Sequence, residues 1–185
     1  MKIPDHYVIR VNLAWTFSID DLIENLDSYS NDFFIDIPSG RTKPPSNKYS
    51  LESLYPIFTE RVNVRYLAIS NVEKSSQLEN YKVFGARPIL VPKIESIAGV
   101  ENIDEIMSGI KTEKIIMIDH DDLHTSLINN EVSPSKLYSD YVDPLLEYCD
   151  NNNIKALRTR GIVFSDEWIT QNFSILGDKI YQQGG

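Results

Sequence analysis

The segment VPKIESIAGVENIDEIM, residues 91–107, places a lysine and a glutamate two positions apart at the end of an apolar run. In an extended strand, residues i and i+2 point to the same side, so Lys93 and Glu95 share a direction. Charged groups at the end of a buried strand are costly to desolvate unless they have a partner. The two charges therefore either form an ion pair or hold a ligand, and these two residues alone favour the ion pair.

Other polar side chains gather where predicted strands end. They are Arg10 and Asn12, Asp36, Asp119 to Asp122, and Arg158 to Arg160. In open parallel sheets and in (β/α)8 barrels alike, ligands bind at the carboxyl ends of the strands. We therefore expect a functional site at this edge of the sheet.

Strand-like and helical segments alternate along the chain. The strand-like segments, rich in apolar and β-branched residues, are 6–15, 32–38, 64–70, 88–95, 113–119 and 154–164. The segments with helical patterns are 18–30, 50–62, 74–85, 100–110 and 133–153. The first of these helices is predicted to begin at Ser18 as its N-cap. This alternation predicts one α/β domain over residues 1–185, built on a parallel sheet.

Composition and charge exclude several classes of protein. The net charge of −9 offers no basic face to nucleic acid. No apolar run approaches the roughly 18 residues of a membrane span, and the N-terminal MKIPDHYVIR lacks the features of a signal peptide. The single cysteine, Cys149, excludes an internal disulfide, and its helical context predicts a buried, inert thiol. We expect a cytoplasmic protein without nucleic-acid or membrane partners.

Several segments match motifs of one known family in the same order along the chain. They are IRVNLAW, FIDIPSGRTK, LAISNVEKSSQLEN, VPKIESIAGVENIDEIM, IIMIDHDDL and ALRTR. Over residues 7–165 the chain thus resembles the catalytic barrel of pyruvate kinase and the wider phosphoenolpyruvate/pyruvate barrel superfamily, which includes citrate-lyase-like aldolases. The resemblance implies a TIM-like (β/α) barrel.

The resemblance also implies a role for each matching residue. Glu95 and Asp122 take the positions of two carboxylates that hold a divalent cation, Mg²⁺ or Mn²⁺. Lys93 takes the position of a lysine beside the enolate oxygen, where a cation stabilises developing negative charge. The remaining matches are Arg10 and Thr159 as catalytic residues, and Asn12, Lys43 and Asp36 as substrate-binding residues.

The chain departs from the family pattern at several positions. Ala14 and Ile37 replace oxygen ligands of a potassium site, which is therefore predicted to be lost. Lys43 replaces an arginine clamp and does not bind phosphate bidentately. The loop 39–48 carries no inserted lid domain, whereas phosphoryl transfer to ADP needs a closed, dry site.

These departures disfavour phosphotransfer. The sequence instead predicts an aldolase- or lyase-like enzyme acting on phosphoenolpyruvate, pyruvate or a related 2-oxo acid through an enolate. The alternative is a catalytically inactive domain that serves as a binding or regulatory subunit.

A closed (β/α)8 barrel takes about 250 residues, so a chain of 185 residues predicts a truncated or incomplete barrel. The open edge of such a sheet invites pairing, and we expect a strand of the tail or a second copy in a homodimer to cover it.

Some residues near the predicted site have simpler interpretations. Asp119 is expected to N-cap a helix, which leaves Asp122 as the ligand. His120 and His124 are expected at the surface, and Trp15 is expected to pack. Arg158 and Arg160 bind an anion or pair with the acidic surface, and the sequence does not choose between these roles.

Overall fold

The computed structural model describes residues 8–38, 48–158 and 173–176. The strands are β1 (Val8–Asn12), β2 (Phe33–Ile37), β3 (Val64–Ile69), β4 (Ile89–Ile94), β5 (Ile115–Ile118), β6 (Lys155–Arg158) and β7 (Phe173–Leu176). The α-helices are α1 (Ile19–Asp27), α2 (Leu51–Glu60), α3 (Ile97–Glu101), α4 (Ile103–Ser108), α5 (His120–Asn129) and α6 (Asp143–Asn151). The 3₁₀ segments are η1 (Leu13–Trp15), η2 (Ser75–Phe84) and η3 (Pro134–Lys136), and η4 (Leu137–Val142) is a π-helix.

The strands form one sheet in the order β6-β5-β4-β3-β2-β1-β7. Neighbouring strands from β1 to β6 are parallel, so each strand–helix unit places its next strand beside the previous one. The last strand, β7, lies antiparallel to β1. The prediction of an α/β fold on a parallel sheet is confirmed.

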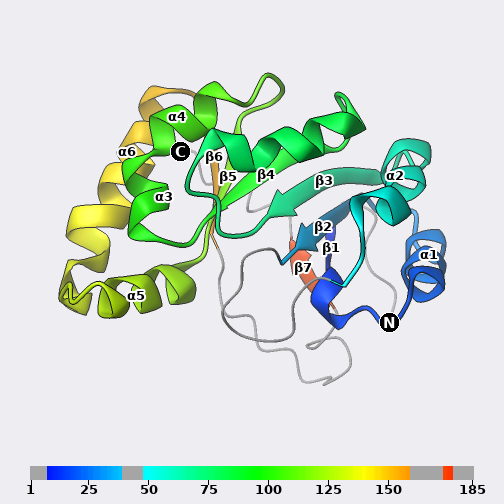
Figure 1. Cartoon of the computed structure of the whole chain (residues 1–185), viewed down its shortest axis with the longest axis horizontal. Coiled ribbons are helices and arrows are strands. Elements are labelled where there is room, and N and C mark those ends of the chain that lie inside the picture. Colours follow the sequence, from blue (N-terminus) through cyan, green and yellow to red (C-terminus); the bar gives the residue numbers. More distant parts are fainter. Residues whose placement is uncertain (1–7, 39–47, 159–172, 177–185) are drawn as a thin grey trace.

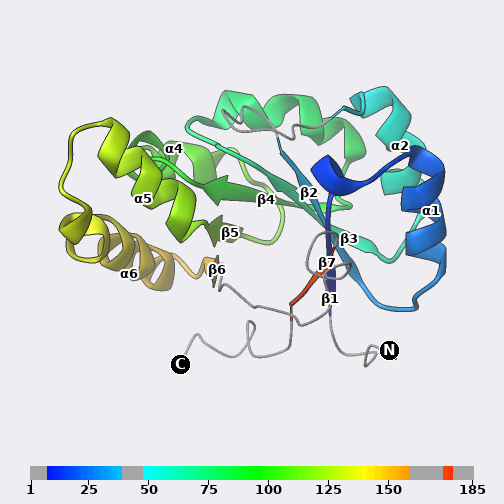
Figure 2. The ribbon, with the colours of Figure 1, turned by 90° about the horizontal axis from the view of Figure 1, so that it is seen from below.

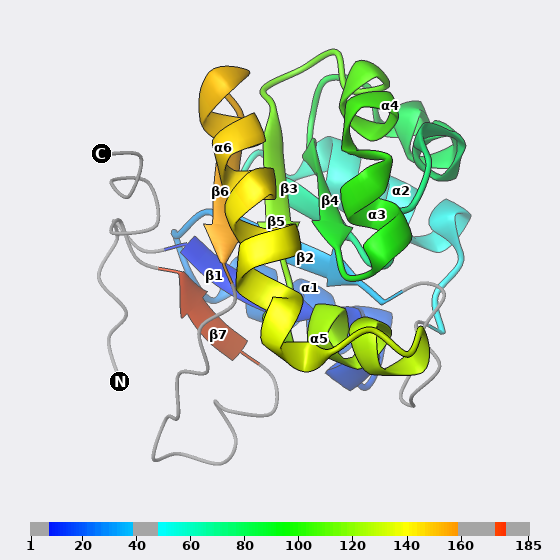
Figure 3. The same cartoon turned by 90° about the vertical axis from the view of Figure 1, so that its left-hand side faces the viewer.

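The sheet curls into a half-barrel, with the helices along its convex side. Figure 2 shows the helices in an arc from α1 through α2 to α5 and α6, and Figure 3 shows α3 to α6 in front of the strands that they cover. The larger hydrophobic core lies between these helices and the sheet, and includes Ile35, Leu67, Ile94 and Leu123. Hydrophobic burial on this side of the sheet is the main force that holds the helices in place.

A second, smaller core lies on the concave side of the sheet. Its members alternate with those of the larger core along the strands: Val8, Phe34, Tyr66, Ala68, Val91, Ile115, Met117 and Leu157. All of these side chains are buried. Because successive strand residues point to opposite faces, polar residues two positions further along these strands also face the concave side.

Two predicted helices differ from the structure, and a third helix was given no range. The segment 74–85 forms the 3₁₀ segment η2, in which Leu78 and Phe84 are buried six positions apart, a spacing that does not match one face of an α-helix. The helix that Asp119 was expected to cap is α5, and no range was predicted for it, although Leu123 and Leu127 give it a buried i, i+4 stripe. The segment 133–153 changes from 3₁₀ to π to α, and α6 begins beside Pro144.

The carboxyl ends of β1 to β5 lie at one edge of the sheet (Figure 1). Within the described residues the strand order is linear, and no pairing joins β6 to β7. A strand of the tail therefore extends the β1 edge instead of closing a ring, and the homodimer stays a prediction. A search of the described helices finds none with the length and apolar character of a membrane span.

Candidate metal centre

Polar side chains form a layer at the carboxyl end of the concave face. Each follows a buried apolar residue by two positions: Asp36 follows Phe34, Lys93 follows Val91, and Asp119 follows Met117. The charged groups therefore lie above an apolar floor from which water is excluded. In such surroundings an electrostatic interaction is stronger than the same interaction in bulk water.

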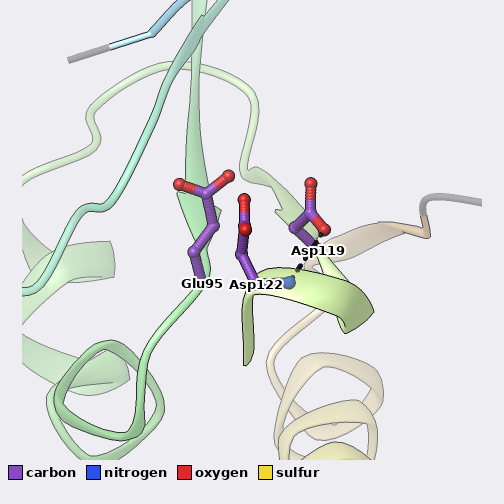
Figure 4. A group of neighbouring side chains, drawn as sticks. All are labelled: Glu95, Asp119 and Asp122. Carbon is purple, nitrogen blue, oxygen red and sulfur yellow. Dashed lines mark hydrogen bonds between the residues drawn. The ribbon is translucent and has the colours of Figure 1, made fainter. Parts of the chain in front are cut away.

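Three carboxylates converge in this layer. Glu95 follows β4, Asp119 joins β5 to α5, and Asp122 lies in the first turn of α5. One oxygen of each lies within 4.8 Å of the other two. Figure 4 shows the three carboxylates pointing the same way from these separate elements.

The start of α5 accounts for this convergence. The side chain of Asp119 is the N-cap of the helix and accepts a hydrogen bond from the Asp122 N–H at 3.4 Å. The predicted capping role of Asp119 is thus confirmed, and the same residue also joins the carboxylate group. The capped turn leaves Asp122 next to Asp119, facing Glu95 (Figure 4).

Lys93 is buried among these acidic groups, with 5% of its surface exposed. Its Nζ lies 2.5 Å from Glu95 Oε1, 3.5 Å from Asp36 Oδ2 and 3.8 Å from Asp119 Oδ2. Burial alone lowers the pKa of Lys93, but the charges of Asp36 and Glu95 outweigh burial and raise the pKa above its usual value. Lys93 is therefore an ammonium group at neutral pH.

Glu95 is 7% exposed and its two oxygens differ. Oε2 accepts a hydrogen bond from the Asn71 N–H at 2.6 Å. Oε1 forms an ion pair with the Lys93 ammonium, and it has no other partner in the described part of the chain. Burial raises the pKa of Glu95 above its usual value, and the nearby ammonium opposes that shift only in part. The Lys93 ammonium and the Asn71 N–H are thus the described partners that compensate this buried charge.

Arg10 and Asp36 form the second half of the polar layer. The Arg10 guanidinium donates a short hydrogen bond to Asp36, which is fully buried. Burial alone raises the pKa of Asp36, but the charges of Arg10 and Lys93 outweigh burial and lower the pKa below its usual value. Asp36 is therefore ionised. The Nε of Arg10 is a buried donor without a hydrogen-bond partner among the described residues.

The remaining predicted site residues are placed as follows. Asn12 lies beside Asp36 in the β1–β2 register, and its side-chain oxygen accepts the Ala14 N–H at 2.9 Å, which caps η1. Lys43 and Thr159 lie outside the described residues. Trp15 is 45% exposed, so the predicted packing role is wrong for much of its surface.

Two other side chains with a predicted environment are not members of the three-carboxylate cluster. His120, expected at the surface, is half-buried and packs against Tyr138 in a tilted arrangement with ring centroids 5.8 Å apart. Cys149 is buried as predicted, and burial raises the pKa of its thiol to about 12.

The charges of this layer do not balance. Four described carboxylates, Asp36, Glu95, Asp119 and Asp122, surround two cationic side chains, Arg10 and Lys93. Two negative charges therefore remain when all six groups are ionised. Carboxylate oxygens are the ligands that Mg²⁺ and Mn²⁺ prefer, so the donor set and the residual charge both fit one divalent cation.

No protein-family model and no curated protein matches the chain. Among solved structures, the fold is similar to that in "Crystal Structure of RipC from Yersinia pestis", with a TM-score of 0.60 and 15% sequence identity. The match covers 86% of this chain and 72% of the RipC chain. At this identity the likeness shows the fold alone.

These comparisons correct the resemblance to pyruvate kinase. No family model supports it, RipC is among the solved structures that share the fold, and the sheet is an open half-barrel. The short motif matches follow the strand–helix alternation and the polar strand ends, which are common to α/β folds with parallel sheets. Assignment to the pyruvate kinase family is therefore wrong, and the roles of Lys93, Glu95 and Asp122 now depend on their geometry. The chain is an α/β protein with a curled, mostly parallel sheet and a partly buried acidic cluster at its carboxyl edge.

Proposed function

We propose that the chain binds a divalent cation, Mg²⁺ or Mn²⁺, through Glu95, Asp119 and Asp122, and acts on a small 2-oxo acid through an enolate. One observation carries this proposal: Glu95 after β4 and two carboxylates at the start of α5, Asp119 and Asp122, have oxygens within 4.8 Å of one another beside a buried ammonium group. Beyond the Lys93 ammonium, Glu95 Oε1 has no partner among the described residues, which leaves this oxygen open to a cation.

A 2-oxo acid suits such a site because its carboxylate and keto oxygens chelate a hard cation together. Three carboxylate ligands leave about three positions of an octahedral ion for the acid and a water. A bound cation would act as a Lewis acid and polarise the keto group. The two cationic side chains of the layer attract the carboxylate of the acid, and its carbon chain lies over the apolar floor.

Lys93 supplies the electrostatic part of the proposed reaction. Enolisation breaks a C–H bond next to the keto carbon, and the proton leaves to water. The bond pair forms a C=C bond, and the keto oxygen takes the negative charge. Lys93 Nζ stays protonated and donates a hydrogen bond to that oxygen, which stabilises the enolate. Its raised pKa keeps it charged and excludes it as the base at neutral pH.

The test follows hydrogen exchange at the methyl group of pyruvate in D₂O by NMR, with Mn²⁺ or Mg²⁺ present. This readout needs no second substrate. We expect exchange that depends on protein and metal together and is lost in Glu95→Gln. The matched control is Glu101→Gln, which removes an exposed carboxylate from α3 and should leave exchange unchanged.

The second candidate is a binding or regulatory subunit without catalysis. The observation that favours it is that Lys93 already contacts Asp36, Glu95 and Asp119, as in a stable charge network. This function predicts that metal and acid raise the melting temperature together, without exchange. If calorimetry detects neither metal binding nor acid binding, both candidates are wrong.

A further inference from the structure

The Lys93 ammonium lies where it competes with a cation for Glu95. Its Nζ is 2.5 Å from Glu95 Oε1, an oxygen of the three-carboxylate cluster. Mg²⁺ binds oxygen ligands at about 2.1 Å, so an ammonium at its present distance from Glu95 would lie close to the ion. Two positive charges this close in a buried site repel each other strongly.

The surroundings of Lys93 provide an alternative position for its ammonium group. Asp36 Oδ2 lies 3.5 Å from Nζ, and Ser70 Oγ accepts a hydrogen bond from Nζ at 3.4 Å. Ser70 in turn donates to Asp36 Oδ1, also at 3.4 Å. A small rotation of the lysine side chain toward Asp36 and Ser70 frees Glu95 and keeps the ammonium paired.

We propose that Lys93 is a built-in competitor of the divalent cation, holding Glu95 in the metal-free protein and releasing it when metal binds. The inference rests on the metal site of the proposed function. Competition by Lys93 makes metal binding weaker than binding to the three carboxylates alone would be. An acid bound beside the metal gives the displaced ammonium a new anionic partner, so metal and acid each strengthen the binding of the other.

The test measures Mn²⁺ affinity by calorimetry in the whole chain and in variants of Lys93. Loss of the positive charge in Lys93→Met or Lys93→Gln should tighten Mn²⁺ binding by roughly tenfold or more. Lys93→Arg keeps the charge and should stay near the wild-type affinity. The matched control is Lys114→Met, an exposed lysine just before β5 at the opposite end of that strand, which should change nothing.

Oxalate, a metal-chelating analogue of a 2-oxo acid enolate, tests the coupling between the two ligands. Oxalate should tighten Mn²⁺ binding in the wild type. The fold increase in Mn²⁺ affinity should be smaller in Lys93→Met, because no ammonium is displaced there. An equal factor in both proteins would overturn the coupling.

The results separate the two proposals. If the wild type binds no Mn²⁺, the metal site itself is wrong. If it binds Mn²⁺ and the neutral Lys93 variants bind it equally or more weakly, the competition is wrong and the metal site stands. The neutral variants lose a cationic partner for Asp36, so their folding is checked by circular dichroism. Saturating Mn²⁺ should stabilise them more than the wild type. If both neutral variants stay unfolded at saturating Mn²⁺, the proposal fails, since the metal should replace the missing charge.

Discussion

The backbone N–H of Asn71 donates a 2.6 Å hydrogen bond to Oε2 of Glu95. Asn71 follows β3 and adopts a left-handed backbone conformation, with φ at +53°. Asparagine and glycine tolerate this conformation, whereas a β-branched residue is strained in it. The turn after β3 thus aims a donor at the carboxylate that follows β4.

We predict that Asn71→Val destabilises the protein by about 1–2 kcal/mol and weakens Mn²⁺ binding, because the strained turn no longer holds Glu95. Asn71→Gly permits the same conformation and keeps the donor, so its Mn²⁺ affinity should stay close to that of the wild type. Urea unfolding and Mn²⁺ calorimetry measure the two effects. Equal Mn²⁺ affinity for Val and Gly at this position would show that the turn does not position Glu95.

The ion pair between Arg10 and Asp36 is expected to be important for stability. Asp36 is fully buried, so removal of Arg10 leaves a buried carboxylate with only part of its compensation, from Lys93 and Ser70. We predict that Arg10→Met costs about 3 kcal/mol, and that adding Asp36→Leu recovers much of this loss. Urea unfolding of the single and double variants measures the coupling. A double variant no more stable than Arg10→Met would contradict the prediction.

The sequence pattern alone predicted much of the scaffold of the site. Strand alternation placed Lys93 and Glu95 on one face, and the structure confirms both this direction and the simple alternative of an ion pair, at 2.5 Å. The gathering of polar residues at strand ends also located the layer that holds Arg10 and Asp36. These inferences succeed because strand periodicity is local, and parallel strands carry their carboxyl ends to one edge.

Other parts of the site depend on contacts between distant residues. The Asn71 donor reaches across 24 positions, and its left-handed turn has no unique signature in the sequence SNV. Asp119 was predicted as a helix cap alone. Its proximity to Glu95 follows from the β4–β5 register, which joins residues far apart in the sequence. A signal for α5 was present in Leu123 and Leu127, four apart after a capping aspartate, and it predicts the turn that carries Asp122.

The raised pKa of Glu95 makes its contribution to stability dependent on pH. The folded protein holds the proton on Glu95 more tightly than the unfolded chain, whose carboxyl titrates near 4.5. Stability from this group is therefore present below that pH and is lost as pH rises through the folded pKa. We predict that metal-free Glu95→Gln, which does not ionise, gains stability relative to the wild type as the pH rises above about 4.5. Urea unfolding across this range measures the difference.

Mn²⁺ should reverse that order, since it binds ionised Glu95 and stabilises only the native wild type. A stability difference between wild type and Glu95→Gln that stays constant with pH would show that burial of Glu95 is not costly.

Asp119 combines two roles that substitutions can separate. Its side chain caps α5, and its carboxylate belongs to the three-residue cluster. Asparagine caps helices as well as aspartate does but carries no charge, whereas alanine neither caps a helix nor carries a charge. We predict that Asp119→Asn keeps the metal-free stability near the wild-type value and weakens Mn²⁺ binding roughly tenfold, about 1.4 kcal/mol. Asp119→Ala should weaken Mn²⁺ binding similarly and also lose about 1 kcal/mol of stability.

Mn²⁺ calorimetry and metal-free urea unfolding, measured on both Asp119 variants, distinguish these roles. Ser18→Ala is the matched control, because it removes the N-cap of α1, far from the cluster along the chain, where Ser18 Oγ accepts the Asp21 N–H at 3.0 Å. It should cost a similar amount of stability and leave Mn²⁺ affinity unchanged. If Asp119→Asn binds Mn²⁺ as tightly as the wild type, Asp119 is a helix cap alone, and a bound cation would depend on Glu95 and Asp122.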